Sequence, residues 1–305
     1  LTPELTADYN EQTSLNAYRF LCAGIGTMIG AIIVMPIVAA FSSKAAGFSA
    51  AGAVIGVVIV AATLVTFLSV REAVPPVRKA SAQSESLVSV YAAIFKNRAY
   101  LVLLAVFTLH ITAINFLQGI VVYYLKYIYH AESFATTVMA VLLIAAMGSI
   151  PLAAKCSNTF GKNVSYRIGL GVIAGVAMVI FFIGHKIGTT ALAVLFGAAG
   201  VGVGFAFSTP WAMLPDAIAL QQGSVHNEGC YYGVWTFASK LGQAVSTGLT
   251  GLILSAAGYH ADAVQLPKTI FAIRCIAGPI AAAVCLSGFL LLRWFPSSTA
   301  EMQST

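Results

Sequence analysis

The chain has 305 residues, of which 59% are hydrophobic and only 9% are charged, and its formal net charge is +6. A soluble domain would carry about a quarter charged residues. This composition excludes that class and, with several apolar runs close to 20 residues, indicates an all-α polytopic membrane protein. In such a protein a positive net charge usually reflects basic cytoplasmic loops, so we expect no nucleic-acid partner.

The first part of the chain alternates polar segments with apolar runs. Residues 1–19 are polar, as is typical of a loop, and because the chain does not open on methionine we expect it to be N-terminally truncated. Apolar runs over Arg19–Phe41 and Ser49–Val70 predict two membrane helices. Residues 1–71, a loop and these two helices, would then form the end of an N-terminal six-helix bundle. Residues 72–98 are rich in charge and proline and predict a linker, the cytoplasmic central loop.

Six further apolar runs predict a second bundle over residues 99–294, followed by a polar tail at 295–305. Their expected ranges are Ala99–Leu125, Phe134–Ala154, Tyr166–Gly184, Thr190–Leu214, Tyr231–Ala257 and Thr269–Trp294. The fourth is expected to end before Pro215, because proline interrupts a helix. The whole chain therefore predicts about eight transmembrane helices, two followed by six.

Lysine and arginine residues indicate the orientation of these helices. If residue 1 lies inside the cell and the helices alternate, ten of these residues fall inside and five fall outside. The inside set is Arg19, Arg71, Arg78, Lys79, Lys96, Arg98, Lys155, Lys162, Arg167 and Arg293. Because cytoplasmic loops carry the excess of these residues, we expect both chain ends to be cytoplasmic in a plasma (cell inner) membrane.

Lys240 falls outside this pattern. With a helix that starts at Tyr231, it lies about 14 Å along the axis, near the middle of a hydrocarbon layer about 30 Å thick. An ionisable residue at this depth is costly and is by default a functional-site hypothesis. Thr236, Gln243 and Thr247 share its helical face, which predicts a polar stripe of ligand contacts along a cavity.

No acidic residue falls at mid-membrane in the predicted topology, so Lys240 has no predicted counter-charge within the chain. It is then deprotonated, solvated by water in a cavity, or paired with helices outside the chain. His110, Asn115 and Gln118 either line the same cavity or, for the histidine, form an interior hydrogen bond.

Asp216, His226 and Glu228 lie in an expected inside loop, where they predict a cytoplasmic gate of salt bridges or a plain solvated loop. The sequence contains no nucleophile–base arrangement and no metal-ligand spacing. We therefore expect neither an enzyme nor a resident metal or cofactor.

Two motifs resemble the glycoside–pentoside–hexuronide:cation symporters, the melibiose-permease-like branch of the major facilitator superfamily. The first is P-E-L-T-A-D-Y-N-E-Q-T-S-L-N-A-Y-R at residues 3–19, which is similar to the loop before their fifth helix. The second comprises W-A-M-L-P-D, H-N-E-G-C-Y-Y-G-V-W-T-F-A-S-K-L-G-Q-A and G-Y between residues 211 and 259. It looks like their tenth and eleventh helices, so the chain would hold helices 5–12 of 12.

The resemblance implies two six-helix bundles that rock around a central cavity, and a sugar symporter that uses Na⁺ or H⁺ as coupling cation. Arg19 matches the family arginine that contacts sugar, and Lys240 and Thr236 match polar site residues on helix eleven. Phe207 stands where melibiose-type transporters have a sugar-stacking tryptophan, while Trp235 would stack on the sugar or fill the bundle. The family's cation-binding carboxylates lie on helices two and four, outside this chain.

The chain departs from the family pattern at the inner end. Gln12 replaces an arginine, Ala219 replaces the second aspartate of P-D-x-x-D, and His226 replaces the arginine of R-x-E. Each change weakens an ion pair of the expected gate. Two alternatives stay open: a lipid or amphiphile transporter of the same fold, and a non-transporting fragment or partner subunit. The family analogy implies a monomer.

Overall fold

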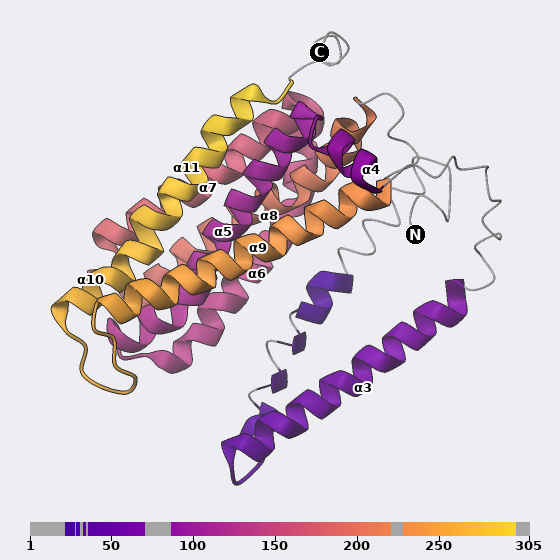
Figure 1. The fold of residues 1–305 in the computed structure, drawn as a ribbon. Coiled ribbons are helices and arrows are strands. Elements are labelled where there is room, and N and C mark those ends of the chain that lie inside the picture. Colours follow the sequence, from indigo (N-terminus) through magenta and orange to yellow (C-terminus); the bar gives the residue numbers. More distant parts are fainter. Residues whose placement is uncertain are drawn as a thin grey trace. The chain divides into compact units, whose positions relative to one another are not determined.

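The computed structural model describes residues 22–27, 29–30, 33–34, 36–70, 87–220 and 228–296. These ranges contain helices, turns and loops but no strand (Figure 1). The chain divides into two compact units, Leu1–Ser84 and Glu85–Thr305, and each is described by itself below. The division falls inside the segment that was predicted to be a linker.

The first unit contains a helical hairpin. Short helical segments lie between residues 22 and 39, and after a turn α3 runs over Lys44–Val70 (Figure 1). A Cβ on Gly47 would lie 2.7 Å from the carbonyl oxygen of Val38, so the absence of a side chain lets the two arms approach closely. α3 is apolar on all sides, as expected of a helix that faces lipid. The expected helix over Arg19–Phe41 lies partly outside the described residues.

The described residues of the second unit form mainly long helices. They are α5 (Arg98–Tyr127), α6 (Ala135–Phe160), α7 (Lys162–Ile183), α8 (Thr189–Ala219), α9 (Glu228–Ala256) and a last, interrupted helix over Pro267–Trp294. Each lies where an apolar run predicted it. In the described residues, α3 and all of these helices except α9 are long and apolar enough to cross a membrane. The predicted all-α polytopic membrane architecture is confirmed.

The amphipathic helix α9 differs from its neighbours. Its 29 residues span about 43 Å at 1.5 Å per residue, which is long enough to cross a bilayer. Its hydropathy is lowered by the polar residues along one face. A polar face on a helix of membrane-spanning length is expected where the helix borders a cavity rather than lipid.

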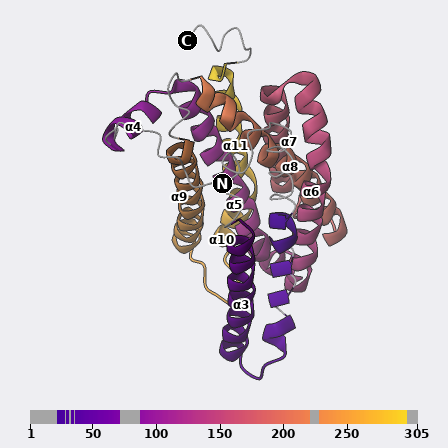
Figure 2. The same ribbon diagram turned by 90° about the vertical axis from the view of Figure 1, so that its right-hand side faces the viewer.

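The helices of the second unit form two groups around α5. Figure 2 shows α5 between α9 on one side and α6, α7 and α8 on the other. The last helix consists of α10 (Pro267–Cys275), the π-helical turn η3 (Ile276–Ile280) and α11 (Ala281–Leu291), and it packs against α5 and α7. The π turn contains Pro279, which accounts for the interruption because proline has no N–H to donate.

Glycines on α8 bring its backbone against α6. A Cβ on Gly200 would lie 2.3 Å from the carbonyl oxygen of Leu142, and a Cβ on Gly204 would lie 2.0 Å from Oγ of Ser149. Ser149 Oγ in turn donates a hydrogen bond to the carbonyl oxygen of Val201 at 3.2 Å. Small residues at helix crossings are the usual route to close packing in membranes, so these glycines fix α6 against α8.

The prediction that α8 ends before Pro215 is wrong. The helix continues to Ala219, although Pro210 and Pro215 lie inside it. Each proline removes one helical hydrogen bond, and neighbouring side chains hold the C-terminal end of α8 in place. Asn97, the N-cap of α5, donates from Nδ2 to the carbonyl oxygen of Ala217 at 2.7 Å.

A short helix, α4 (Leu87–Ile94), lies inside the range 72–98 that was expected to be the linker between the two bundles. Val90 and Ile94 are buried in the core of the second unit. These two apolar residues are four positions apart and so lie on one face of a helix. This spacing is the feature of the sequence that indicated a buried helix here.

Candidate functional site

The polar stripe predicted on α9 is present. Because α9 begins at Glu228, Lys240 lies about 18 Å along it, close to its middle. Lys240 Nζ donates to Oε1 of Gln243 at 3.4 Å. Thr236 and Thr247 flank this pair, and their hydroxyls donate to carbonyl oxygens of α9 itself at 2.9 and 3.0 Å. The side chains of Lys240, Thr236 and Thr247 are exposed in this unit.

A close crossing of α5 and α9 fixes the position of the stripe. A Cβ on Gly242 would lie 2.8 Å from Oγ1 of Thr112 and 3.0 Å from the carbonyl oxygen of Thr108. Thr112 also donates its hydroxyl to the carbonyl oxygen of Gly242 at 3.3 Å. Gly242 is buried while Lys240, two residues earlier, is exposed. The crossing therefore sets the rotation of α9 that leaves the stripe uncovered.

Trp235 lies in the core and not on the stripe. Its side chain is fully buried, and its ring stacks on that of Phe107 with centroids 4.0 Å apart and planes at 17°. The ring of Trp211 lies 6.0 Å away in an edge-on arrangement. The structure favours the interpretation that Trp235 fills the bundle. Its stacking on Phe107 of α5 also orients the neighbouring Thr236 on α9.

The other aromatic and polar candidates have different environments. Phe207 on α8 is 38% exposed, which leaves part of its ring accessible. His110 is fully buried on α5, and its Nδ1 lies 3.2 Å from the hydroxyl of Tyr166 on α7. Of the two alternatives for His110, the structure favours an interior hydrogen bond over a position lining the cavity. Asn115 donates from Nδ2 to the carbonyl oxygen of Ile111 within α5 at 2.9 Å.

Asp216, near the C-terminal end of α8, forms an ion pair that the sequence analysis missed. Nζ of Lys162 lies 2.6 Å from its Oδ2 and also donates to the carbonyl oxygen of Ala212 at 2.9 Å. Lys162 is the first residue of α7. The predicted topology places Lys162 and Asp216 on the same side of the membrane. This common side was the indication in the sequence that the two residues could form an ion pair.

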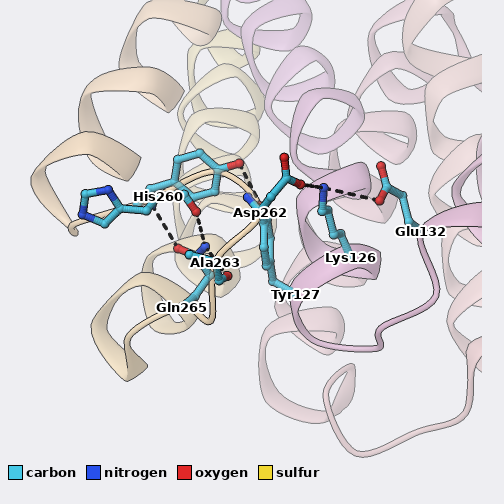
Figure 3. Close-up of polar contacts among 8 residues, drawn as sticks. Lys126, Tyr127, Glu132, His260, Asp262, Ala263 and Gln265 are labelled. Atoms are coloured by element: carbon cyan, nitrogen blue, oxygen red, sulfur yellow. Dashed lines mark hydrogen bonds and ion pairs between the residues drawn. The ribbon is translucent and has the colours of Figure 1, made fainter.

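A second charged cluster lies at the opposite end of the bundle, where the loop after α9 meets the end of α5 (Figure 3). Nζ of Lys126 lies 2.6 Å from Oδ1 of Asp262 and 3.4 Å from Oε2 of Glu132. The hydroxyls of Tyr127 and Tyr259 are 3.0 Å apart. Burial, and then the hydrogen bond with Tyr127, raises the pKa of the Tyr259 hydroxyl, so it stays protonated.

Three of the predicted site residues lie wholly or partly outside the described structure. Arg19 and His226 lie outside the described residues, and Glu228 begins α9 without a described side chain. Within the described ranges, no group of three or more His, Cys, Asp or Glu residues could hold a metal ion. Among the described residues, the stripe on α9 supplies exposed polar side chains at mid-helix for ligand binding.

A family model for MFS/sugar transport proteins matches residues 1–298. The chain belongs to this family. Membership confirms the resemblance to the glycoside–pentoside–hexuronide branch of the major facilitator superfamily and the fold that it implied. Family membership and the apolar helices together support a multi-pass membrane protein, and the relatives below are named as transporters rather than enzymes.

Individual members of the MFS/sugar transport protein family are similar at modest identity. A putative sulfoquinovose importer of Escherichia coli (strain K12) is 27% identical over 90% of this chain and 58% of its own length. An isoprimeverose transporter of Lactiplantibacillus pentosus is 25% identical over 90% of this chain and 58% of its own length. The sodium-dependent lysophosphatidylcholine symporter 1 of Homo sapiens is 25% identical over 97% of this chain and 60% of its own length. The chain thus spans less than two thirds of the length of these relatives.

Proposed function

We propose that this chain belongs to a secondary active transporter that moves a sugar together with Na⁺ or H⁺ across the plasma membrane by alternating access. The observation that carries the proposal is the stripe around Lys240, a basic group at the middle of a helix that is long enough to cross a membrane. Such residues mark substrate or ion pathways. The names of the sulfoquinovose and isoprimeverose relatives support a sugar as cargo.

In this proposal the sugar hydroxyls bind Lys240, Thr236 and Gln243, with Phe207 stacking on the ring. Arg19, which the family resemblance also implies as a sugar contact, lies outside the described residues. Stacking is reasonable for Phe207 because its ring is partly exposed. The coupling cation binds outside this chain, at carboxylates on other helices of a monomer. Both chain ends are cytoplasmic, so that the Lys162–Asp216 pair, with His226 and Glu228 nearby in sequence, belongs to the inner gate.

Uptake of labelled sugars into membrane vesicles, driven by a Na⁺ or H⁺ gradient, tests this proposal. We expect Lys240→Ala to reduce uptake by at least about tenfold, since a charge-assisted hydrogen bond contributes about 1.5–3 kcal/mol. Lys155→Ala is the matched control, because Lys155 is exposed near the inner end of α6 and lies outside the stripe. Full uptake by Lys240→Ala would remove this residue from the site.

A second candidate cargo is a lysophospholipid or similar amphiphile. It is favoured by the name of the human relative and by the apolar side chains of Phe237 and Leu241, which are exposed beside the stripe. Competition distinguishes the two cargoes. Sugar uptake that persists in the presence of saturating lysophosphatidylcholine supports the first proposal, and uptake of lysophosphatidylcholine that sugars do not inhibit supports the second.

A further inference from the structure

Two arginines lie at a seam in the second unit, where the beginning of α7 packs against the end of the last helix (Figure 1). The guanidinium carbon of Arg167, on α7, lies 5.8 Å from the ring centroid of Phe289 on α11. Arg293 lies about one turn further along the last helix, and its guanidinium carbon is 4.7 Å from the ring centroid of Trp294. The seam therefore places two positive charges from distant parts of the chain at one end of the bundle.

The polar groups of this seam are fixed in position, but their hydrogen-bonding capacity is only partly used. Asn163, one turn before Arg167 on the same face of α7, donates from Nδ2 to the carbonyl oxygen of Leu292 at 3.2 Å. The Oδ1 atom of Asn163 and the Nε atom of Arg167 are buried and have no hydrogen-bond partner among the described residues. Buried polar atoms of this kind are commonly satisfied by water or by a bound group.

Exposed apolar side chains flank the polar seam on both helices. On α7 they are Val164 and Ile168, which directly follow the two polar residues, and on the last helix they are Leu286 and Leu290. The members of each pair are four positions apart, so each pair forms an apolar strip along one helix face. Trp294 is half exposed at the end of the last helix, and tryptophan is enriched at the level of lipid headgroups. The seam thus combines two cations with surfaces that suit acyl chains.

We infer that this seam binds an anionic phospholipid, with the phosphate on Arg167 and Arg293 and the acyl chains along the apolar strips. Arginine binds phosphate through paired hydrogen bonds, and basic sites between membrane helices bind anionic headgroups. Arg167 lies about 8 Å along α7, close to the helix end, where headgroups meet acyl chains. The inference concerns the lipid around the protein and is independent of the transported cargo.

The charge of the headgroup should decide the affinity. Each arginine near the membrane surface should strengthen the binding of an anionic lipid about fivefold. Phosphatidylcholine also carries a phosphate, but its choline cation cancels the net charge, so it should bind at least about fivefold more weakly than phosphatidylglycerol with the same chains. A soluble glycerol phosphate should bind far more weakly than either lipid, because it leaves the apolar strips without a partner.

The test is native mass spectrometry of the full protein from micelles that contain dioleoylphosphatidylglycerol and dioleoylphosphatidylcholine, with sn-glycerol 3-phosphate as a soluble competitor. The variants are Arg167→Gln and Arg293→Gln. Arg293 is exposed, so its replacement should leave the fold intact. Lys155→Gln is the matched control, because Lys155 is exposed on α6 while Ala153, two residues earlier, accepts a hydrogen bond from Ser165 of α7. Lys155 therefore points away from the seam. A melting temperature within a few degrees of wild type establishes that each variant is folded.

The expected result is a phosphatidylglycerol molecule retained in preference to phosphatidylcholine, with the preference reduced about fivefold in each arginine variant and unchanged in Lys155→Gln. Equal retention of the two lipids overturns the inference, as does a preference that persists in both arginine variants. A loss in Lys155→Gln as large as in the arginine variants would show general attraction to a basic surface, which also overturns it. Displacement of the lipid by an equal concentration of glycerol phosphate would make this a site for soluble anions and overturn the assignment to a lipid.

Discussion

Lys162 Nζ lies 2.6 Å from Oδ2 of Asp216 and 2.9 Å from the carbonyl oxygen of Ala212, and so joins the first residue of α7 to the last two turns of α8. The two charged side chains are 36% and 40% exposed. The pair itself is therefore worth only about 0–1 kcal/mol. Its position beside Pro215 makes it a tether for a helix end that lacks one of its own hydrogen bonds.

Removal of this tether should affect transport more than stability. We expect Lys162→Gln and Asp216→Asn each to reduce the maximal uptake rate several-fold and to lower the melting temperature by less than about 4 °C. Because the residues contact each other, the double variant should be no worse than the poorer single variant. Independent, additive losses in the two single variants would show that the pair does not act as a unit.

The glycines that face α6 should tolerate no side chain. In Gly204→Ala the new Cβ would meet Ser149 Oγ at 2.0 Å and the carbonyl oxygen of Ala146 at 2.2 Å, so α8 would have to move away from α6. We expect a loss of about 1–3 kcal/mol, typical of overpacking, measured as a lower melting temperature in detergent. Gly171→Ala on α7 is the control, because nothing lies within 4 Å of its added Cβ. It should be neutral or stabilising by up to about 1 kcal/mol, and equal behaviour of the two variants would refute this account.

Substitutions of Trp235 separate a core role from a ligand contact. Trp235→Ala removes the ring that stacks on Phe107 and should cost about 3–5 kcal/mol of stability. Trp235→Phe keeps a stacking ring, so we expect a smaller loss of stability and a sugar dissociation constant within about threefold of wild type. A dissociation constant that rises tenfold in Trp235→Phe, with an unchanged melting temperature, would instead make Trp235 a sugar contact.

Asp262 combines an ion pair with an unusual backbone. Its φ of 56° lies in the left-handed region, where Asp and Asn are tolerated better than Ala. Asp262→Asn should therefore weaken the pair with Lys126, a small loss for these exposed groups that should shrink in high salt. Asp262→Ala should lose about 1–2 kcal/mol more through backbone strain, independently of salt. Limited proteolysis of the loop after α9 at two salt concentrations measures both effects. Equal cleavage rates for Asp262→Asn and Asp262→Ala would contradict the expected backbone strain in the alanine variant.

The membrane helices were predictable because each is a long apolar run, and the mid-helix position of Lys240 was predictable because it interrupts such a run. The end of α8 was not predictable, since the rule that proline stops a helix is local, whereas Asn97 and Lys162 hold the C-terminal end of α8 from distant parts of the chain. The burial of Trp235 also depends on a partner, Phe107, that is 128 positions away in sequence. Facing side chains are set by tertiary packing that hydropathy does not encode.

The glycine contacts of α8 and the uncovered stripe of α9 place opposite limits on sequence change. Side chains added at Gly200 or Gly204 would force two helices apart, so the interlocked part of the bundle has little freedom to diverge. The side chains of Thr236, Lys240 and Thr247 are exposed in the described part of this unit. Selection for new cargo can therefore act along one face of α9 without rebuilding the scaffold, and a combinatorial library for altered transport should begin there.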